Sequence, residues 1–146
     1  MSCIVAKDIM HPRVSLPAKM AGYELVEKLM SPYPALPVVD DDHRVLGVVS
    51  EYDVLTALKE GRTIHEFSAE SLMTCGHAEH GACDKPITVM PETAIEDIVD
   101  LFIHRNLTIL PVVENGKLVG IISRKNIINA LAEKGFWPEH EFQKRV

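Results

Sequence analysis

Two cysteines and two histidines fall within one short segment of the chain, residues 75–83. They follow one another as Cys75, His77, His80 and Cys83, with two glycines among them. Zinc prefers thiolate and imidazole ligands and usually takes four of them in a structural site, and iron accepts similar ligands. The glycines would let the segment turn tightly around an ion. The spacing therefore predicts a site for zinc or iron, although four ligands from one short loop would strain a tetrahedron.

Two other interpretations of this segment stay open. A disulfide between Cys75 and Cys83 would make the loop a redox switch, whereas a solvent-exposed loop would carry these residues by coincidence. The chain has 3 cysteines, an odd number, with no spacing typical of a disulfide framework. The sequence also contains no Walker phosphate-binding pattern and no convincing nucleophile–base pair. We therefore expect a binding protein and not an enzyme.

A serine followed three residues later by Asp or Asn occurs twice, as Ser50 with Asp53 and as Ser123 with Asn126. Each pair precedes an apolar segment and resembles a capping box, with Asp or Asn where Glu or Gln is usual. A carboxylate accepts charge-assisted hydrogen bonds, which are worth about 1 kcal/mol more than neutral ones. The Asn126 amide lacks that charge, so we expect the two pairs to bind unequally.

The elements that position these pairs form a repeat. Leu36 and Leu110 are 74 positions apart, and Gly47 and Gly120 are 73 apart. The matching runs are Leu36-Pro37-Val38-Val39-Asp40 and Val45-Leu46-Gly47-Val48-Val49-Ser50, then Leu110-Pro111-Val112-Val113-Glu114 and Leu118-Val119-Gly120-Ile121-Ile122-Ser123. The upstream runs Asp8-Ile9-Met10 and Ser71-Leu72-Met73 are only 63 positions apart. The second copy therefore carries about ten extra residues after Met73.

Each copy has the pattern of a β-α-β-β-α unit. An extended segment, 13–16 or 86–90, precedes an amphipathic helix, and in the second copy Pro91-Glu92-Thr93 supplies a turn and a cap for it. Two β-branched strands follow, joined in the second copy by the hairpin sequence Asn115-Gly116. A second helix closes each unit, and Gly61 and Gly135 stand where helices end. The apolar helix positions are Ala21, Leu25, Val26, Leu29, Met30, Val54, Leu55 and Leu58, then Ile95, Ile98, Val99, Phe102, Ile127, Ile128 and Leu131.

One such unit exposes an apolar sheet face, which a second copy can cover. We therefore predict the fold class α/β (α+β), a pseudo-twofold pair of β-α-β-β-α repeats whose small mixed sheets face each other. Repeat 1 spans residues 1–67 and repeat 2 spans 68–135, with a linker at about 62–68. The Cys/His loop is an insertion at 74–85, and residues 136–146 form a mixed, aromatic tail.

Composition narrows the class of function. The apolar fraction is 47% and the charged fraction is 25%, as in ordinary globular domains. The net charge of -6 speaks against nucleic acid or an acidic membrane as a partner. No apolar run reaches the roughly 20 residues of a membrane helix, and the N-terminus does not resemble a signal peptide. We expect no membrane insertion and a cytoplasmic location.

The repeat resembles a pair of CBS domains, also called a Bateman module. The resemblance rests on the Leu-Pro-Val-Val runs and on the two segments Gly47-Val48-Val49-Ser50-Glu51-Tyr52-Asp53 and Gly120-Ile121-Ile122-Ser123-Arg124-Lys125-Asn126. It covers about residues 6–135. The resemblance implies that an adenine nucleotide (AMP, ADP or ATP) or S-adenosylmethionine binds in clefts between the repeats. It also implies that the chain modulates a partner protein, whose identity is unknown, and forms a homodimer.

The same resemblance assigns roles to individual residues. It implies that the Ser50 hydroxyl meets a phosphate near a helix N-terminus, where anions bind well, and that Asp53 accepts from ribose hydroxyls. Ser123, Asn126 and Arg124 would form the second site, Arg124 meeting phosphate unless it lies on a solvated helix face. Ser15 and Thr88 would lie near the clefts. The adenine would be framed by backbone groups around Ala35, Leu36, Ile109 and Leu110, with Pro37 and Pro111 beside them. The alternatives are a helix cap for the Ser50 pair and ordinary strand packing for the apolar residues.

Overall fold

The computed structural model describes residues 4–30, 32–76 and 85–134 of the chain. In this part of the chain no helix is long and apolar enough to cross a membrane. The elements follow one another as α1 (Ala6–Ile9), β1 (His11–Pro12), β2 (Leu16–Pro17), α2 (Gly22–Leu29), β3 (Ala35–Val39), β4 (Val45–Ser50), α3 (Glu51–Lys59), α4 (Ala69–Leu72), α5 (Ile95–His104), β5 (Ile109–Glu114), β6 (Lys117–Ser123) and α6 (Arg124–Lys134).

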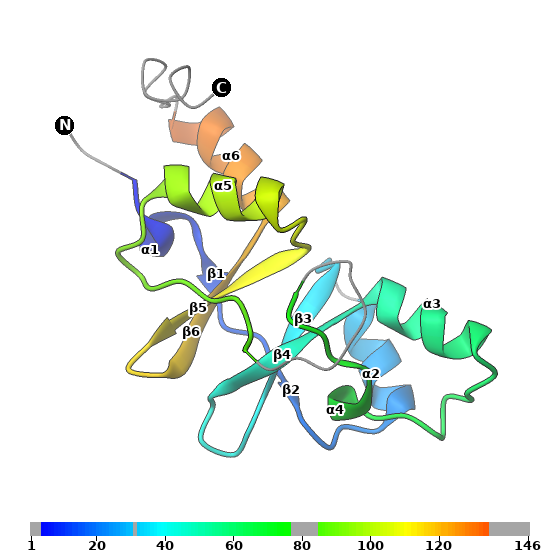
Figure 1. Ribbon diagram of the computed structural model, residues 1–146. Coiled ribbons are helices and arrows are strands. Elements are labelled where there is room, and N and C mark those ends of the chain that lie inside the picture. Colours follow the sequence, from blue (N-terminus) through cyan, green and yellow to red (C-terminus); the bar gives the residue numbers. More distant parts are fainter. Residues whose placement is uncertain (1–3, 31, 77–84, 135–146) are drawn as a thin grey trace.

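Within the described residues the strands form two three-stranded sheets, each accompanied by its own helix pair (Figure 1). In the first sheet β3 pairs parallel with β2 and antiparallel with β4. In the second sheet β6 pairs antiparallel with both β1 and β5. A parallel bridge between Val89 and Val112 stands where the β2–β3 pairing stands in the first sheet. The predicted pair of small mixed sheets is confirmed.

The first extended segment of each repeat is shorter than predicted. Of residues 13–16 only Leu16 lies in a strand, and of residues 86–90 only Val89 forms a bridge. Prolines flank or enter both segments, at Pro12, Pro17 and Pro86. Since proline has no N–H to donate to a ladder, these segments cannot extend into longer strands.

Helices α2 and α5 bury most of the apolar face that the sequence predicts, but Met30, which the sequence assigns to that face of α2, is 80% exposed. Leu25 and Leu29 of α2 lie in one core cluster, and Ile98 and Phe102 of α5 lie in another. Each is 8% exposed or less. Burial of one face against a sheet, and not propensity alone, holds such short helices in place.

The predicted helix ends are partly confirmed. Gly61 follows α3 with a φ of 85°, which suits glycine, and its N–H donates to the Leu58 carbonyl at 3.0 Å. The turn expected at Pro91-Glu92-Thr93 is confirmed, but the cap expected there is wrong, because Ala94 is the N-cap of α5. The Thr93 hydroxyl instead accepts from the Met90 N–H at 3.0 Å and so closes the preceding turn. Gly135 and the tail 136–146 lie outside the described residues.

The leading segment of each repeat packs on the sheet of the other repeat. Helix α1 belongs to the core cluster around α5 and β6, and His11 of β1 pairs with Ile121. Reciprocally, α4 belongs to the cluster around α2 and β4, and Thr74 bridges to Val48. Figure 1 shows α1 beside the second sheet and α4 near α2. The boundary at residue 67 therefore divides the sequence repeat, whereas each spatial module takes its leading segment from the other copy.

Two glycines allow this exchange. A Cβ on Gly120 would lie 2.5 Å from Met10 Sδ and 2.9 Å from the His11 carbonyl oxygen. A Cβ on Gly47, at the equivalent place, would lie 2.8 Å from the Thr74 carbonyl oxygen. Real Cβ atoms do not approach other atoms this closely, so the leading segments fit only against strands that lack a side chain there.

The two sheets also share core residues. Leu118 and Ile121 of β6 belong to the cluster that is otherwise built from residues 14–73. Ala35, Val48 and Ile109 form a separate small cluster between β3, β4 and β5. Each repeat thus covers part of the other's apolar face, as predicted from the single exposed face of one unit.

Candidate functional site

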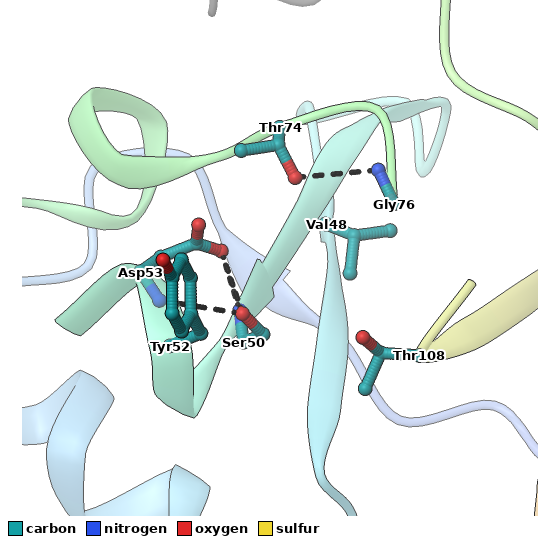
Figure 2. A pocket seen from close by; sticks show the side chains of 7 residues that line it. All are labelled: Val48, Ser50, Tyr52, Asp53, Thr74, Gly76 and Thr108. Atoms are coloured by element: carbon teal, nitrogen blue, oxygen red, sulfur yellow. Dashed lines mark hydrogen bonds between the residues drawn. The ribbon is translucent and has the colours of Figure 1, made fainter. Parts of the chain in front are cut away.

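A cavity of about 240 Å³ lies between the two repeats, beside the N-terminus of α3. Figure 2 shows the side chains around it, which come from both repeats. Its lining consists of Val48, Ser50, Tyr52 and Asp53 from repeat 1 and Thr74, Gly76 and Thr108 from repeat 2. Of the residues that the sequence predicts for a ligand site, the structure brings Ser50 and Asp53 together here.

Ser50 and Asp53 form a capping box at the start of α3. Asp53 Oδ2 accepts from the Ser50 N–H at 2.8 Å and from the Ser50 hydroxyl at 3.0 Å. The Ser50 oxygen in turn accepts from the Asp53 N–H at 3.3 Å. Asp53 is only 7% exposed, whereas Ser50 is half-buried. The capping interpretation is therefore confirmed, and because both residues also line the cavity, it does not compete with a ligand role.

The opposite wall comes from the leading segment of repeat 2, which sequence reasoning did not identify. Thr74 and Val48 exchange backbone hydrogen bonds of 2.8 Å each way. The Gly76 N–H donates to the Thr74 hydroxyl at 3.3 Å, and the Gly76 carbonyl accepts from the Thr108 N–H at 3.3 Å. Hydroxyls at positions 74 and 108 thus face the Ser50 pair across the cavity. The exchange of leading segments places Thr74 there, and Thr108 immediately precedes β5 of the other sheet, so no local pattern in the sequence predicts them.

Tyr52 was also missed, although its place in the sequence carries a signal. It lies between Ser50 and Asp53 on the first turn of α3, is 58% exposed and lines the cavity. An exposed aromatic ring at the rim of a polar cavity offers a flat apolar surface to a ligand. Together with hydroxyls, a carboxylate and the positive end of a helix dipole, it gives the cavity groups suited to a small polar ligand that carries a flat ring.

The second Ser-x-x pair repeats the bonds of the first. Asn126 Oδ1 accepts from the Ser123 N–H at 2.7 Å and from its hydroxyl at 3.1 Å, and the Ser123 oxygen accepts from the Asn126 N–H at 3.3 Å. Neither residue lines the cavity at Ser50. Arg124, predicted to meet a phosphate, lies instead in a groove between α5 and α6 and donates to the Leu107 carbonyl at 2.9 Å.

The residues expected to frame an adenine are buried strand residues. The side chains concerned are Ala35, Leu36, Pro37, Ile109, Leu110 and Pro111. None of these side chains is in the lining of the cavity. Ala35 and Ile109, however, pack directly against Val48, which is a lining residue. The side chains of Ala35 and Ile109 therefore support the Val48 part of the wall from behind. Ser15 and Thr88 are half-buried and also lie outside that lining.

The Cys/His loop is described only at its start. Cys75 is disulfide-bonded, and its partner lies outside the described residues, as do His77, His80 and Cys83. Among the residues that the structure describes, no three His, Cys, Asp or Glu side chains gather as a metal site would require. Three of the four metal ligands expected from the sequence therefore lie outside the described residues.

Comparison with known proteins finds similarity to CBS domains. The family model of the CBS domain matches residues 6–60 and 82–133. CBSX2, a chloroplastic CBS domain-containing protein of Arabidopsis thaliana, is 32% identical over 125 residues, which are 73% of this chain and 51% of that protein. Homoserine O-acetyltransferase of Methanococcus vannielii is 30% identical over 97 residues, 66% of this chain and 18% of the enzyme. The chain thus spans about half, or less, of the length of these relatives.

Solved structures extend the likeness to the pair of repeats. CBSX2 in complex with AMP has a TM-score of 0.74 at 27% identity, over 90% of this chain and 98% of that one. The CBS domain pair of protein MJ0100, in complex with 5′-methylthioadenosine and S-adenosyl-L-methionine, has a TM-score of 0.75 at 20% identity, over 91% and 99%. Hypoxic Response Protein I, with two coordinated zinc ions, has a TM-score of 0.73 at 21% identity, over 86% and 98%.

Proposed function

The chain belongs to the CBS-domain family, and from that premise we propose that it is a regulatory module that binds an adenosine-containing ligand between its two repeats. The observation that carries the proposal is the cavity at the start of α3, where Ser50 and the buried Asp53 face Thr74 and Thr108. AMP in CBSX2, and 5′-methylthioadenosine and S-adenosyl-L-methionine in MJ0100, support adenosine as the shared part of the ligand.

The groups around the cavity suit the parts of such a ligand. Asp53 supplies the acceptor for ribose hydroxyls, since a carboxylate is the strongest acceptor of hydrogen bonds in the site. The Ser50 hydroxyl and the N-terminal end of α3 favour a phosphate or another anionic group. The cavity of about 240 Å³ is below the usual range for a whole drug-sized ligand, about 300–1,000 Å³. We therefore propose that it holds the ribose and its 5′ substituent while the rest of the ligand lies nearer to solvent.

A ligand panel tests this function directly. We expect AMP, ADP, ATP or S-adenosylmethionine to raise the melting temperature of the purified chain, because a ligand present at about 100 times its Kd adds about 2.7 kcal/mol of stability. GMP serves as the matched control for the base. Isothermal titration calorimetry then gives the affinity and the number of sites. If no adenosine ligand stabilises the chain or releases heat, the proposal is overturned.

The two Ser-x-x pairs support unequal binding. Asn126 makes the same capping bonds as Asp53 but offers no negative charge to ribose hydroxyls. We propose that the Ser50 site is filled first and that a second site near Ser123 and Thr88, if filled, binds more weakly. A titration with two resolved affinities, or with one site per chain, agrees with this order.

A redox role for the Cys/His loop is the second candidate function. The disulfide at Cys75 supports it, because a sulfur in a disulfide is no longer the thiolate that a metal requires. Zinc binding by the loop is the competing hypothesis, because Hypoxic Response Protein I, which has the same fold, holds two coordinated zinc ions. Mass spectrometry after thiol alkylation, with and without reductant, and zinc analysis of the reduced chain separate the two. One zinc per reduced chain, lost when Cys75 and Cys83 are both changed to Ser, would favour the metal.

For the regulated partner we propose only its class, which is an enzyme or another protein. A segment similar to this chain makes up 18% of a homoserine O-acetyltransferase, which supports the idea that such modules act next to enzymes. We propose that ligand binding changes how this chain contacts an enzyme or another partner, since a ligand shifts an equilibrium only through different affinities for two states. The cytoplasmic location also stays a prediction.

A further inference from the structure

Cys75 belongs to the segment that forms one wall of the cavity between the repeats. It stands between Thr74 and Gly76, and both of these neighbours line the cavity on the side opposite Ser50 (Figure 2). Cys75 itself is half-buried and disulfide-bonded. A covalent bond to another part of the chain therefore restrains this wall at its centre.

The hydrogen bonds of this wall become weaker after Thr74. Thr74 exchanges two backbone bonds of 2.8 Å with β4, which fix the start of the segment. The Gly76 N–H donates to the Thr74 hydroxyl at 3.3 Å, and the Thr108 N–H donates to the Gly76 carbonyl at 3.3 Å. The Ile87 N–H donates to the Cys75 carbonyl at 3.5 Å. Because good N–H···O bonds are about 2.7–3.2 Å long, these three bonds hold the rest of the wall only weakly.

Gly76 carries the wall to the junction of the two sheets. It is buried and has a φ of 105°, which glycine adopts without strain. A Cβ on Gly76 would lie 3.7 Å from the Val48 side chain on β4 and 3.8 Å from the Leu107 side chain, which comes shortly before β5. The position of Gly76 therefore determines the shape of the cavity where the two repeats meet.

From this arrangement we infer that the disulfide at Cys75 controls the affinity of the cavity for its ligand, so that the oxidised chain binds more tightly than the reduced chain. With the disulfide intact the wall is already in place, and a ligand does not have to order it. After reduction the segment gains conformational freedom, which a ligand must then remove. The inference rests on both proposed functions, adenosine binding at Ser50 and a redox role for the Cys/His loop.

The switching step is a thiol–disulfide exchange with an external dithiol. A thiolate of the dithiol attacks one sulfur of the disulfide and forms a mixed disulfide, which the second thiol of the reagent resolves. Two electrons and two protons pass to the chain, whose S–S bond is replaced by two thiols, and the reagent leaves as a disulfide. In the predicted cytoplasmic location, disulfides are mostly catalytic or redox-sensing, which agrees with such a switch.

Calorimetric titration of the full chain, before and after reduction by dithiothreitol, tests the inference. The probe is AMP or S-adenosylmethionine, whichever binds more tightly, and EDTA is present throughout so that zinc does not order the reduced loop. We expect the Kd to rise about fivefold or more on reduction, as is usual for two coupled sites. Reciprocally, the probe should oppose reduction by the same factor, and a tenfold coupling lowers the midpoint potential of the disulfide by about 30 mV.

Cysteine variants locate the effect. Cys75→Ser should bind the probe as weakly as the reduced chain does and should no longer respond to dithiothreitol. The chain has 3 cysteines, so the partner of Cys75 is either Cys3 or Cys83. Of Cys3→Ser and Cys83→Ser, one should reproduce Cys75→Ser, and the other should keep the response and serve as the matched control. Circular dichroism confirms that the variants and the reduced chain are folded.

The outcomes separate this inference from the function on which it rests. A Kd that is the same in both states, or lower after reduction, overturns the inference and leaves adenosine binding in place. A Cys75 that stays a free thiol after treatment with oxidised glutathione also overturns it. If neither AMP nor S-adenosylmethionine binds in either state, the proposed binding function fails, and the inference fails with it.

Discussion

Asp53 and Asn126 hold the ends of equivalent helices with equivalent hydrogen bonds, yet they differ in charge. The Ser50 N–H donates to Asp53 at 2.8 Å, and the Ser123 N–H donates to Asn126 at 2.7 Å. Since the amide makes the same capping bonds as the carboxylate, the chain itself supplies a model for the substitution of one by the other. Charge and helix capping can therefore be separated at Asp53.

We expect Asp53→Asn to weaken AMP binding about tenfold, because a charge-assisted bond is lost and about 1.4 kcal/mol corresponds to tenfold in affinity. The free energy of unfolding should change by no more than about 0.5 kcal/mol, because the cap survives. Calorimetric titration and urea denaturation measure the two quantities. Asn126→Asp is the matched control and should leave the affinity at the Ser50 site unchanged. An unaltered AMP affinity in Asp53→Asn would contradict the proposed role of the carboxylate.

The capping serine has a separate effect on stability. Ser50→Ala removes the acceptor for the Asp53 N–H, so the free energy of unfolding should fall by about 1 kcal/mol. Ser123→Ala should cost a similar amount, because its bond to the Asn126 N–H has the same length of 3.3 Å. Urea denaturation of the two variants makes the comparison. A loss at one position and none at the other would show that the two helix ends are not equivalent in solution.

At the level of elements, the exchange of leading segments decides which residues meet. Thr74 reaches the cavity because the segment after α4 lies along β4, and His11 pairs with β6 by the equivalent exchange. Strand-to-strand contact of this closeness requires Gly47 and Gly120, whose missing side chains leave room for the crossing backbone. A small change at these glycines should therefore act on the contact between the repeats.

Gly120→Ala tests the exchange. The added Cβ would lie 2.5 Å from Met10 Sδ and 2.9 Å from the His11 carbonyl, so β1 must shift and the chain should lose about 1–3 kcal/mol of stability. Lys117→Ala, an exposed position on the same strand, is the control and should change stability by less than about 0.5 kcal/mol. Thermal and urea denaturation report both. A Gly120→Ala chain as stable as the wild type would argue against the packing of β1 on β6.

At the level of the whole molecule, the two repeats share one apolar interior. Leu118 and Ile121 of repeat 2 lie in the core of the first module, and Ile109 packs against Ala35 and Val48. Shared cores couple the stability of the two modules, because neither can open without exposing apolar surface of the other. The cavity at Ser50 lies at this same junction, so the proposed ligand would stabilise both modules together.

This coupling predicts one cooperative unfolding transition for the full chain, with superimposable melts from circular dichroism and calorimetry. A fragment of residues 1–67 should not fold alone, because it lacks α4 and the β6 residues of its core. Mixing it with a fragment of residues 68–146 should restore helical signal. Two separate transitions in the full chain, or a cooperative melt of the isolated fragment, would show that the repeats are independent.

Much of this architecture follows from local patterns. Apolar residues at helical spacing predict α2 and α5, β-branched runs around tight turns predict β3–β4 and β5–β6, and Ser50 with Asp53 predicts the start of α3. These features depend on residues that are neighbours in the chain, and their spacing repeats at 73 or 74 residues. The sequence alone therefore determined a duplicated α/β unit and, of the polar side chains that line the cavity, Ser50 and Asp53.

Tertiary structure decided the rest. The exchange of leading segments brings Thr74 and Gly76 to the Ser50 pair, and the packing of the two sheets brings Thr108 there. Tertiary packing also turns Arg124 toward an outer groove and places Leu36 and Leu110 in the core. None of these contacts joins residues that are close in sequence, and two similar units could have packed with their leading segments either kept or exchanged. Steric room beside Gly47 and Gly120, together with the burial of both sheets against each other, selects the exchanged arrangement and with it the composition of the cavity.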